Sequence, residues 1–112
     1  MRIDSYKFGE IIIEGVKYNH DVIIFPDKVK SNWWRKNGHN LCDEDIKEIL
    51  DYKPDVLIIG KGKYGIMRVP DELIKKLKGM GIDVIVANTD KAVVLYNESK
   101  VEEKVGAFHL TC

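Results

Sequence analysis

A short, glycine-rich and doubly basic loop is the part of this sequence best suited to bind a ligand. Residues 60–65 read Gly-Lys-Gly-Lys-Tyr-Gly and follow an apolar run at residues 55–59. The three glycines match the G-x-G-x-x-G pattern, which in dinucleotide-binding proteins opens a helix that holds a pyrophosphate at its N-terminus. In this chain the residues after Gly65 read as extended, and the helix signal begins only at Pro70. We therefore expect no nicotinamide or flavin dinucleotide, and we predict no cofactor.

The same loop suits a smaller anion. Backbone amides of a glycine loop, assisted by Lys61 and Lys63, can hold a phosphate or a carboxylate. In the structural alternative, the glycines form a tight turn and both lysines are solvated. The sequence leaves these two interpretations open.

Two His-x-x-Cys spacings raise the question of a metal site. His39 precedes Cys42 and His109 precedes Cys112, which together give two imidazoles and two thiols, a set suited to tetrahedral zinc. Residues three apart in a strand face opposite ways, so His109 and Cys112 would share a metal only if the chain turned after Leu110. Separate histidines and a buried cysteine are the commoner arrangement. We predict no metal.

Catalysis by a cysteine or by an acid–base pair has less support. Cys112 would need a cationic neighbour or a helix N-terminus to ionise its thiol, with His109, His39 or His20 as the base. Asp21 could act with His20 or His39 as a general acid and base. His20 and Asp21 are neighbours on a predicted strand and face opposite sides, so we do not expect them to form one dyad. The sequence does not decide whether the chain is an enzyme.

Residues 31–39 form an aromatic and basic segment. Two adjacent tryptophans stand beside cationic and titratable side chains, a composition typical of hot spots in protein interfaces. The segment could also be a lid over a ligand crevice. In the structural alternative, one tryptophan fills the core beneath a long loop and the other covers it. The candidate interaction loop comprises Trp33, Trp34, Arg35 and His39.

The first third of the chain predicts antiparallel hairpins. Strands are expected at about residues 3–8, 9–13, 16–18 and 22–25, with turns at Glu14-Gly15 and Pro26-Asp27. Residues 28–40 carry no period and are predicted to form a long loop. A helix capped by Asp43 follows and ends before Pro54.

The rest of the chain alternates strand and helix. Strands are expected at residues 55–59, 82–87 and 105–110, and helices at about 70–79 and 89–99. This order favours parallel strands joined by right-handed crossovers, whose carboxyl ends lie along one edge of the sheet. Three loops and two helix N-termini would then meet at that edge. The candidate ligand-binding residues are Gly60, Lys61, Gly62, Lys63, Asn88, Thr89 and His109. Taken alone, Thr89 is better explained as a helix cap and Asn88 as a turn residue.

Length and charge limit the classes of function. At 112 residues the chain is long enough for one domain, residues 1–112, and no linker or repeat divides it. Its 18 basic and 18 acidic side chains cancel, so no global field recruits nucleic acid or an anionic membrane. No apolar segment is long enough to span a bilayer, and two cysteines indicate no disulfide framework. We expect a soluble, cytoplasmic protein with the lysine- and glutamate-rich composition typical of thermophiles.

Several segments in a fixed order resemble one known family. They are residues 19–24 (Asn-His-Asp-Val-Ile-Ile), 33–35 (Trp-Trp-Arg), 38–41 (Gly-His-Asn-Leu), 54–62 (Pro-Asp-Val-Leu-Ile-Ile-Gly-Lys-Gly), 88–89 with Ala92, 96–97 (Tyr-Asn) and 108–112 (Phe-His-Leu-Thr-Cys). Together they are similar to the Mth938-like domain, a family of uncharacterised prokaryotic proteins. Its animal relatives include an adipogenesis-associated protein and a mitochondrial complex I assembly factor. The resemblance implies an α/β (mixed α+β) fold in three layers, β/β/α, with a mixed central sheet. It implies no activity.

Two classes of function remain. The first is a non-enzymatic binding or assembly module that presents the tryptophan segment and the crevice to a protein partner or to a second copy of the chain. The second is a small enzyme or sensor in which the loop at residues 60–65 and the carboxyl edge of the sheet bind an anionic small molecule. In that case Lys61, Lys63, Thr89 and His109 would orient the anion, with His39 as a candidate acid or base. We favour the first class because no nucleophile and base stand together in the sequence.

Overall fold

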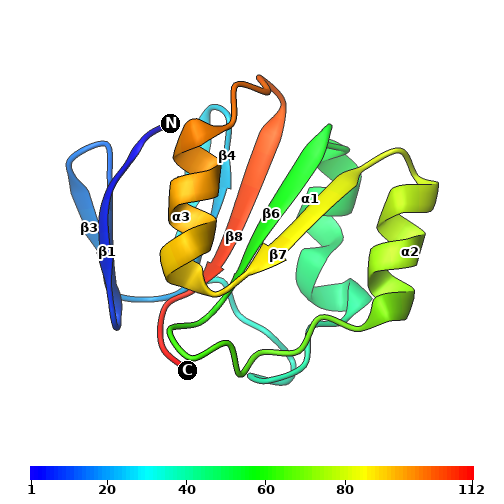
Figure 1. Cartoon of the computed structure of the whole chain (residues 1–112), viewed down its shortest axis with the longest axis horizontal. Helices are drawn as coiled ribbons and strands as arrows, with labels where there is room; N and C mark the ends of the chain where they lie inside the picture. The colour runs from blue at the N-terminus through cyan, green and yellow to red at the C-terminus, as the bar shows by residue number, and fades with distance from the viewer.

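The computed structural model describes residues 1–112, which form two β-sheets, three α-helices and one 3₁₀ helix (Figure 1). In chain order the elements are β1 (Ile3–Lys7), β2 (Glu10–Ile13), β3 (Val16–Tyr18), β4 (Val22–Phe25), β5 (Lys28–Lys30), η1 (Asp43–Ile46), α1 (Lys47–Tyr52), β6 (Val56–Lys61), α2 (Asp71–Gly79), β7 (Asp83–Ala87), α3 (Thr89–Glu98) and β8 (Lys104–His109). None of the helices has the length and apolar character that a membrane crossing requires.

The N-terminal hairpins form a small antiparallel sheet in the order β1-β2-β3. Along β2 the buried residues Ile11 and Ile13 alternate with partly exposed ones, because one face of the sheet packs on the rest of the molecule. The connecting turns place Gly9 and Gly15 at φ 76° and 79°, in the left-handed region that glycine adopts without strain. The predicted antiparallel hairpins are confirmed.

The central sheet has five strands in the order β5-β4-β8-β6-β7. Strand β8 pairs antiparallel with β4 and parallel with β6, and β6 pairs parallel with β7. The residues of β6 from Val56 to Gly60 are all buried, as expected for a strand covered on both faces. The predicted parallel order of the three C-terminal strands is confirmed.

Two predictions for the middle of the chain are wrong. Residues 28–40 are not entirely loop, since Lys28–Lys30 form β5, paired with β4 across the Pro26-Asp27 turn. Three residues are too few to show a sequence period. Asp43 is not the helix cap either: Cys42 occupies the N-cap position, and Asp45 accepts a hydrogen bond from the Cys42 amide at 3.0 Å.

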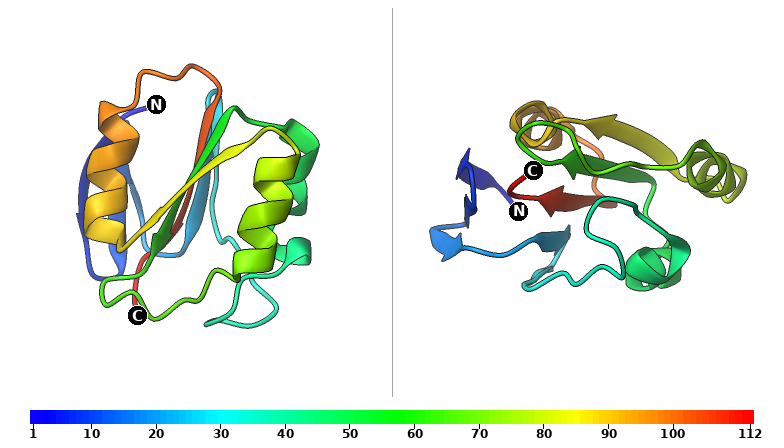
Figure 2. Two further views of the ribbon diagram at one scale, coloured as in Figure 1. Left: turned by 45° about the vertical axis from the view of Figure 1, so that its right-hand side comes forward. Right: turned by 90° about the horizontal axis from the view of Figure 1, so that it is seen from below.

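Helices and the small sheet cover the two faces of the central sheet. Helices α1 and α2 lie on one face, and α3 lies on the other face beside the β1–β3 sheet (Figure 2). The arrangement is an α+β fold in three layers. The layers follow the expected β/β/α order, with one addition: α3 lies in the same layer as the small sheet.

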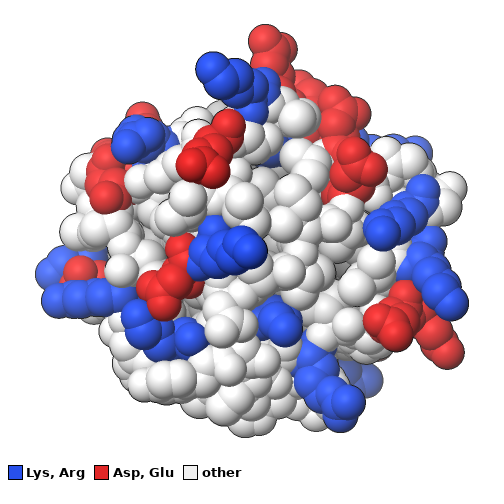
Figure 3. All heavy atoms as spheres, in the orientation of Figure 1, with Lys and Arg blue, Asp and Glu red and all other residues white.

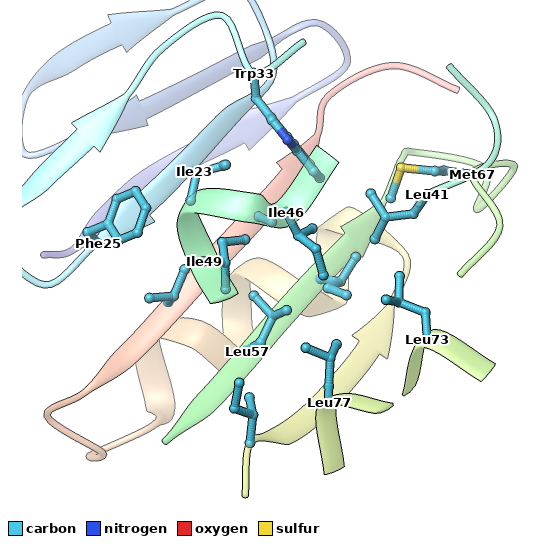
Figure 4. Close-up of a cluster of buried hydrophobic side chains, with 14 residues drawn as sticks. Ile23, Phe25, Trp33, Leu41, Ile46, Ile49, Leu57, Met67, Leu73 and Leu77 are labelled. Atoms are coloured by element: carbon cyan, nitrogen blue, oxygen red, sulfur yellow. The ribbon is translucent and has the colours of Figure 1, made fainter. Parts of the chain in front are cut away.

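Each face of the central sheet has its own apolar core. Fourteen buried residues join the sheet to α1 and α2, and Trp33 enters this cluster from the loop before η1 (Figure 4). A second cluster of 12 buried residues joins the sheet to α3 and the small sheet, with Tyr96 and Phe108 packed edge to face at 5.8 Å between ring centres. These cores fix β6, β7 and β8, and the candidate ligand-binding residues lie at the carboxyl ends of these three strands.

Candidate functional site

The three segments singled out from the sequence meet at the carboxyl edge of the central sheet. The parallel registers place Gly60 beside Ala87 on one side and Phe108 on the other, and Lys61 beside His109. The loop after β6, the start of α3 and the residues after β8 therefore lie together near the C-terminus (Figure 1).

Thr89 ties these three segments to one another. Its Oγ1 accepts a hydrogen bond from the Gly62 amide at 2.8 Å and donates one to the His109 carbonyl oxygen at 2.6 Å. Its own amide donates to the Gly62 carbonyl oxygen at 3.0 Å. Because Thr89 is fully buried and all of these bonds are internal, it acts as a structural clamp in this structure.

The glycine loop closes over the C-terminal segment. The Lys63 amide donates to the Thr111 carbonyl oxygen at 2.6 Å, and the Ile66 amide donates to the Cys112 carbonyl oxygen at 2.9 Å. Gly62 has φ 103°, and a Cβ on it would lie 2.2 Å from the Cys112 carbonyl carbon. Only glycine permits this close approach.

These contacts occupy three of the loop amides that could have formed an anion nest, those of Gly62, Lys63 and Gly65. The amides of Gly62 and Lys63 are bonded as described, and the Gly65 amide donates to the Gly62 carbonyl oxygen at 3.3 Å. An anion held by these amides would have to displace bonds inside the chain. Lys63 also forms an ion pair with Asp90 at 2.9 Å, whereas Lys61 is half-buried and forms no ion pair.

Asn88 lies on the outside of this edge. Its side chain is exposed, and its Oδ1 approaches the α-carbon of Gly65 so closely that a Cβ there would be 2.2 Å away. Gly65 has φ 69°, so the turn also requires glycine for its backbone conformation. The loop is therefore shaped by close contacts, in agreement with the structural alternative for its glycines.

A buried cluster of charged side chains lies at the same edge, where β4 and β8 run antiparallel. Asp21 Oδ2 accepts hydrogen bonds from His109 Nδ1 at 2.8 Å and from Arg35 Nη1 at 2.5 Å. Asp21 Oδ1 accepts a hydrogen bond from the Leu110 amide at 2.8 Å. The side chains of Arg35, His109 and Asp21 are only 6%, 8% and 16% exposed.

The cluster keeps its carboxylate ionised. Burial alone would raise the pKa of Asp21, but the hydrogen bonds from His109, from the Leu110 amide and from Arg35 together hold that pKa below its ordinary value. An ionised Asp21 requires a proton on His109 Nδ1 for this bond, and Arg35 Nη2, which can only donate, also lies 3.0 Å from the same nitrogen. As a result, a charged Asp21–Arg35 pair fixes the tryptophan segment to the ends of β4 and β8.

Two nitrogens of the cluster have no partner. Arg35 Nε and His109 Nε2 are both buried without a hydrogen bond. The Cδ2 atom next to His109 Nε2 lies against Gly62, so the glycine loop covers this side of the ring. An aspartate–histidine pair is the arrangement of an acid–base catalyst, yet here the free nitrogen of the imidazole is closed off from solvent.

The two tryptophans have opposite environments. Trp33 is 4% exposed, its Nε1 donates to the Asp45 carbonyl oxygen at 2.8 Å, and Arg35 stacks 4.9 Å from its ring centre. Trp34 is 74% exposed. One tryptophan therefore fills the core beneath the loop, as the structural alternative held, while the other projects into solvent.

Trp34 stands between two surface hollows. The first has a volume of about 370 Å³ and is lined by Asn19, His20, Asp21, Asn32, Trp33, Trp34, Leu110 and Thr111. The second has a volume of about 320 Å³ and is lined by the two tryptophans with Ile23, Lys30, Asn32, Glu44, Asp45, Lys47 and Glu48. We call the exposed Trp34 and these two hollows the Trp34 surface.

The remaining histidines and cysteines do not gather. His39 is exposed on the loop before η1, and its backbone oxygen accepts a hydrogen bond from the Arg68 amide at 2.8 Å. Cys42 Sγ contacts Asp45 Oδ2 at 3.3 Å. No three His, Cys, Asp or Glu side chains lie close enough to hold one metal ion. Asp21 pairs with His109, not with His20 or His39 as the acid–base hypothesis required.

Sequence reasoning missed the Asp21–Arg35–His109 cluster as a unit. The Asp21–His109 part of the cluster follows from strand register. Strands β4 and β8 pair with Val22 opposite Phe108, and continuing this register brings Asp21 opposite His109. That register follows from knowing which strand neighbours β4, which the order of elements alone does not reveal. The position of Arg35 depends on the path of an irregular loop.

Comparisons with known proteins identify relatives along the whole length. Residues 3–110 match the family described as "Protein of unknown function (DUF498/DUF598)". A conserved hypothetical protein, PH1505 from Pyrococcus horikoshii OT3, is similar at 27% identity and a TM-score of 0.83, with 100% of both chains covered. A protein named MT938 is similar at 26% identity and a TM-score of 0.80, with 99% of this chain and 98% of that chain covered. A Mth938-like domain from Bordetella pertussis shares the fold at 21% identity and a TM-score of 0.68, with 97% of this chain and 85% of that chain covered.

Proposed function

The chain belongs to the Mth938-like family of unknown function (DUF498/DUF598), and we propose that it is a protein-binding module whose contact surface is the Trp34 surface. One observation carries this proposal: a tryptophan that is 74% exposed sits on a loop whose neighbouring residues are fixed by buried bonds. A large aromatic side chain held in water without a partner in its own chain is the usual anchor of a protein interface.

The loop is fixed on both sides of Trp34. The Trp33 amide donates to the Asp21 carbonyl oxygen at 2.7 Å, and Arg35 is held by the Asp21 carboxylate. The Lys36 amide donates to Asp45 Oδ1 at 2.8 Å. The backbone at residue 34 is thus ordered before any partner binds, which lowers the entropy cost of association.

The surroundings of Trp34 indicate the chemistry of the partner. The first hollow offers amide, imidazole and hydroxyl groups from Asn19, Asn32, His20 and Thr111. The second has two lysines and acidic residues along its rim, so neither sign of charge dominates. Basic and acidic side chains are also interspersed on the face shown in Figure 3. This composition suits a partner that receives the indole in an apolar pocket and supplies a polar, mixed-charge rim.

The alternative, a small anion bound at the loop of residues 60–65, has less support. The amides of Gly62, Lys63 and Gly65 bond within the chain, and the imidazole of His109 is covered. A binding module requires neither group to be free.

Site-specific photocrosslinking in the cells that make the protein tests this proposal. A benzophenone amino acid replaces Trp34 in one variant and Tyr52 in a control, because Tyr52 is also an exposed aromatic residue but ends α1 at the opposite end of the sheet. We expect a discrete protein adduct from position 34 and none of the same mass from position 52. The crosslinked partner is then purified for binding measurements with the unmodified chain.

The binding measurement decides the outcome. Trp34→Ala is expected to weaken the affinity about 30-fold, the effect of losing a hot-spot side chain worth about 2 kcal/mol. Tyr52→Ala is expected to leave the affinity unchanged. Equal binding by Trp34→Ala and the unmodified chain, or no adduct from position 34, would reject the Trp34 surface as the contact surface.

A further inference from the structure

The outer edge of β7 is open. This strand pairs only with β6, on one side, and it forms the end of the central sheet (Figure 2). The backbone groups of Val84–Ala87 that point away from β6 have no hydrogen-bond partner in the chain. A row of free amides and carbonyls of this kind is a template for another strand.

The other edges carry features that oppose strand addition. Strand β5 has only three residues, of which Lys28 and Lys30 place charges on that edge. The backbone of Ile3 in β1 is capped by the Asn97 side chain, which bonds both its amide and its carbonyl oxygen. Strand β3 is three residues long and carries Lys17 at its centre. Strand β7 has no lysine, proline or bulge.

The sequence of β7 is complementary to itself. Val84 and Val86 flank Ile85, so an antiparallel pair of β7 strands centred on Ile85 places each Val84 opposite a Val86 and the two Ile85 residues opposite each other. Residues that stand opposite each other in such a pair point to the same face of the sheet, and Ile85 is still 37% exposed in the single chain. We propose that β7 pairs antiparallel with β7 of a second copy about a two-fold axis at Ile85, joining the two central sheets into one.

Charges on α2 support this choice of partner. Helix α2 packs beside β7, so the two-fold axis brings the α2 helices of the two copies side by side and antiparallel (Figure 1). Its first turn carries Asp71 and Glu72, and its C-terminal half carries Lys75 and Lys78. These four side chains form no ion pair within the chain, since the only α2 pair joins Lys76 to Asp43. In the dimer the acidic end of each helix meets the basic end of the other.

This interface is separate from the proposed function. It uses β7 and α2, and it contains no residue of the Trp34 surface. Either proposal can therefore fail while the other stands.

Sedimentation velocity across a concentration series tests the dimer. We expect a species of twice the 12.9 kDa chain mass to accumulate as the concentration rises. Ile85→Lys is expected to raise the dissociation constant at least about tenfold, because it places two like charges opposite each other at the axis. A double variant, Lys75→Glu with Lys78→Glu, leaves the strand intact and is expected to weaken the dimer by removing the complementary charges.

A cysteine tether tests the register. In a background with Cys42→Ser and Cys112→Ser, Ile85→Cys should form a disulfide-linked dimer on mild oxidation, because opposite residues in an antiparallel pair lie within disulfide reach. Val16 is 51% exposed against 37% for Ile85 but lies on β3, so Val16→Cys should form no disulfide-linked dimer under the same conditions. A chain that remains monomeric at its highest soluble concentration, or a dimer unaffected by Ile85→Lys, would overturn the proposal.

Discussion

Replacing Asp21 by asparagine should destabilise the protein far more than removing an exposed ion pair. One oxygen of Asp21 accepts bonds from both His109 Nδ1 and Arg35 Nη1. The other accepts from the Leu110 amide. Asparagine has a single oxygen and a donating NH₂ group, so whichever way it is turned, at least one of these donors faces another donor.

The size of the effect follows from the burial of Arg35. Its guanidinium is 6% exposed and would lose the only carboxylate it contacts. Removing one member of a buried ion pair costs about 3 kcal/mol in the free energy of unfolding, because the remaining charge stays away from water. The control is Asp90→Asn, which removes the Lys63–Asp90 pair at a side chain that is 52% exposed. That change should cost less than about 1 kcal/mol.

Urea denaturation followed by circular dichroism measures both variants at neutral pH. The same measurement at acid pH gives an independent check. The pKa of Asp21 in the folded protein lies below its ordinary value of 3.8, so its contribution is complete above that pH and is lost as the pH falls through the folded value. The gap between the parent chain and Asp21→Asn should therefore close on acidification. A loss no larger than that of Asp90→Asn at neutral pH, or a gap that does not change with pH, would refute the reasoning.

Two further predictions concern the core and the glycine loop. Gly62→Ala should lower the free energy of unfolding by about 3 kcal/mol, because Gly62 has φ 103° and a Cβ there would lie 2.2 Å from the Cys112 carbonyl carbon. Gly9 has φ 76° but nothing within 4 Å of a Cβ, so Gly9→Ala should lower it by only about 1 kcal/mol in the same urea titration. Tyr96→Phe should raise the free energy of unfolding by about 1 kcal/mol because the buried Tyr96 hydroxyl has no partner. Burial raises the pKa of Tyr96 from 10.0 to about 12, so the gain from Tyr96→Phe should grow above pH 10, where only the unfolded parent chain ionises; a gain independent of pH would contradict this.

The sequence allowed the carboxyl edge of the sheet to be located in advance. The apolar run of β6, the alternation of strand and helix and the rule for crossovers together predict that the ends of β6, β7 and β8 meet. These ends do meet, but contacts with distant segments of the chain decide which of their backbone groups are free to bind a ligand. The amide of Lys63, for example, is bonded to the Thr111 carbonyl oxygen.

The tryptophan segment shows most clearly what could not be predicted from the sequence. Trp33 and Trp34 are chemically identical neighbours, and no period in residues 28–40 distinguishes them. Trp33 is buried because the Asp45 carbonyl oxygen accepts its indole N–H and Arg35 covers its ring. These partners come from other parts of the loop and from η1, so tertiary contacts decide which of the two tryptophans is buried.

The central claim is that Trp34 anchors a protein partner, and fluorine NMR of the chain labelled with fluorotryptophan tests it most directly. The spectrum contains two tryptophan signals, which Trp34→Phe assigns, and Trp33 serves as an internal control because it is 4% exposed. When the partner identified by crosslinking is titrated into the labelled chain, the account predicts that the Trp34 signal shifts while the Trp33 signal stays in place. The chemical shift of the Trp34 signal should also lose its dependence on the solvent. Binding that leaves the Trp34 signal unchanged would contradict the account.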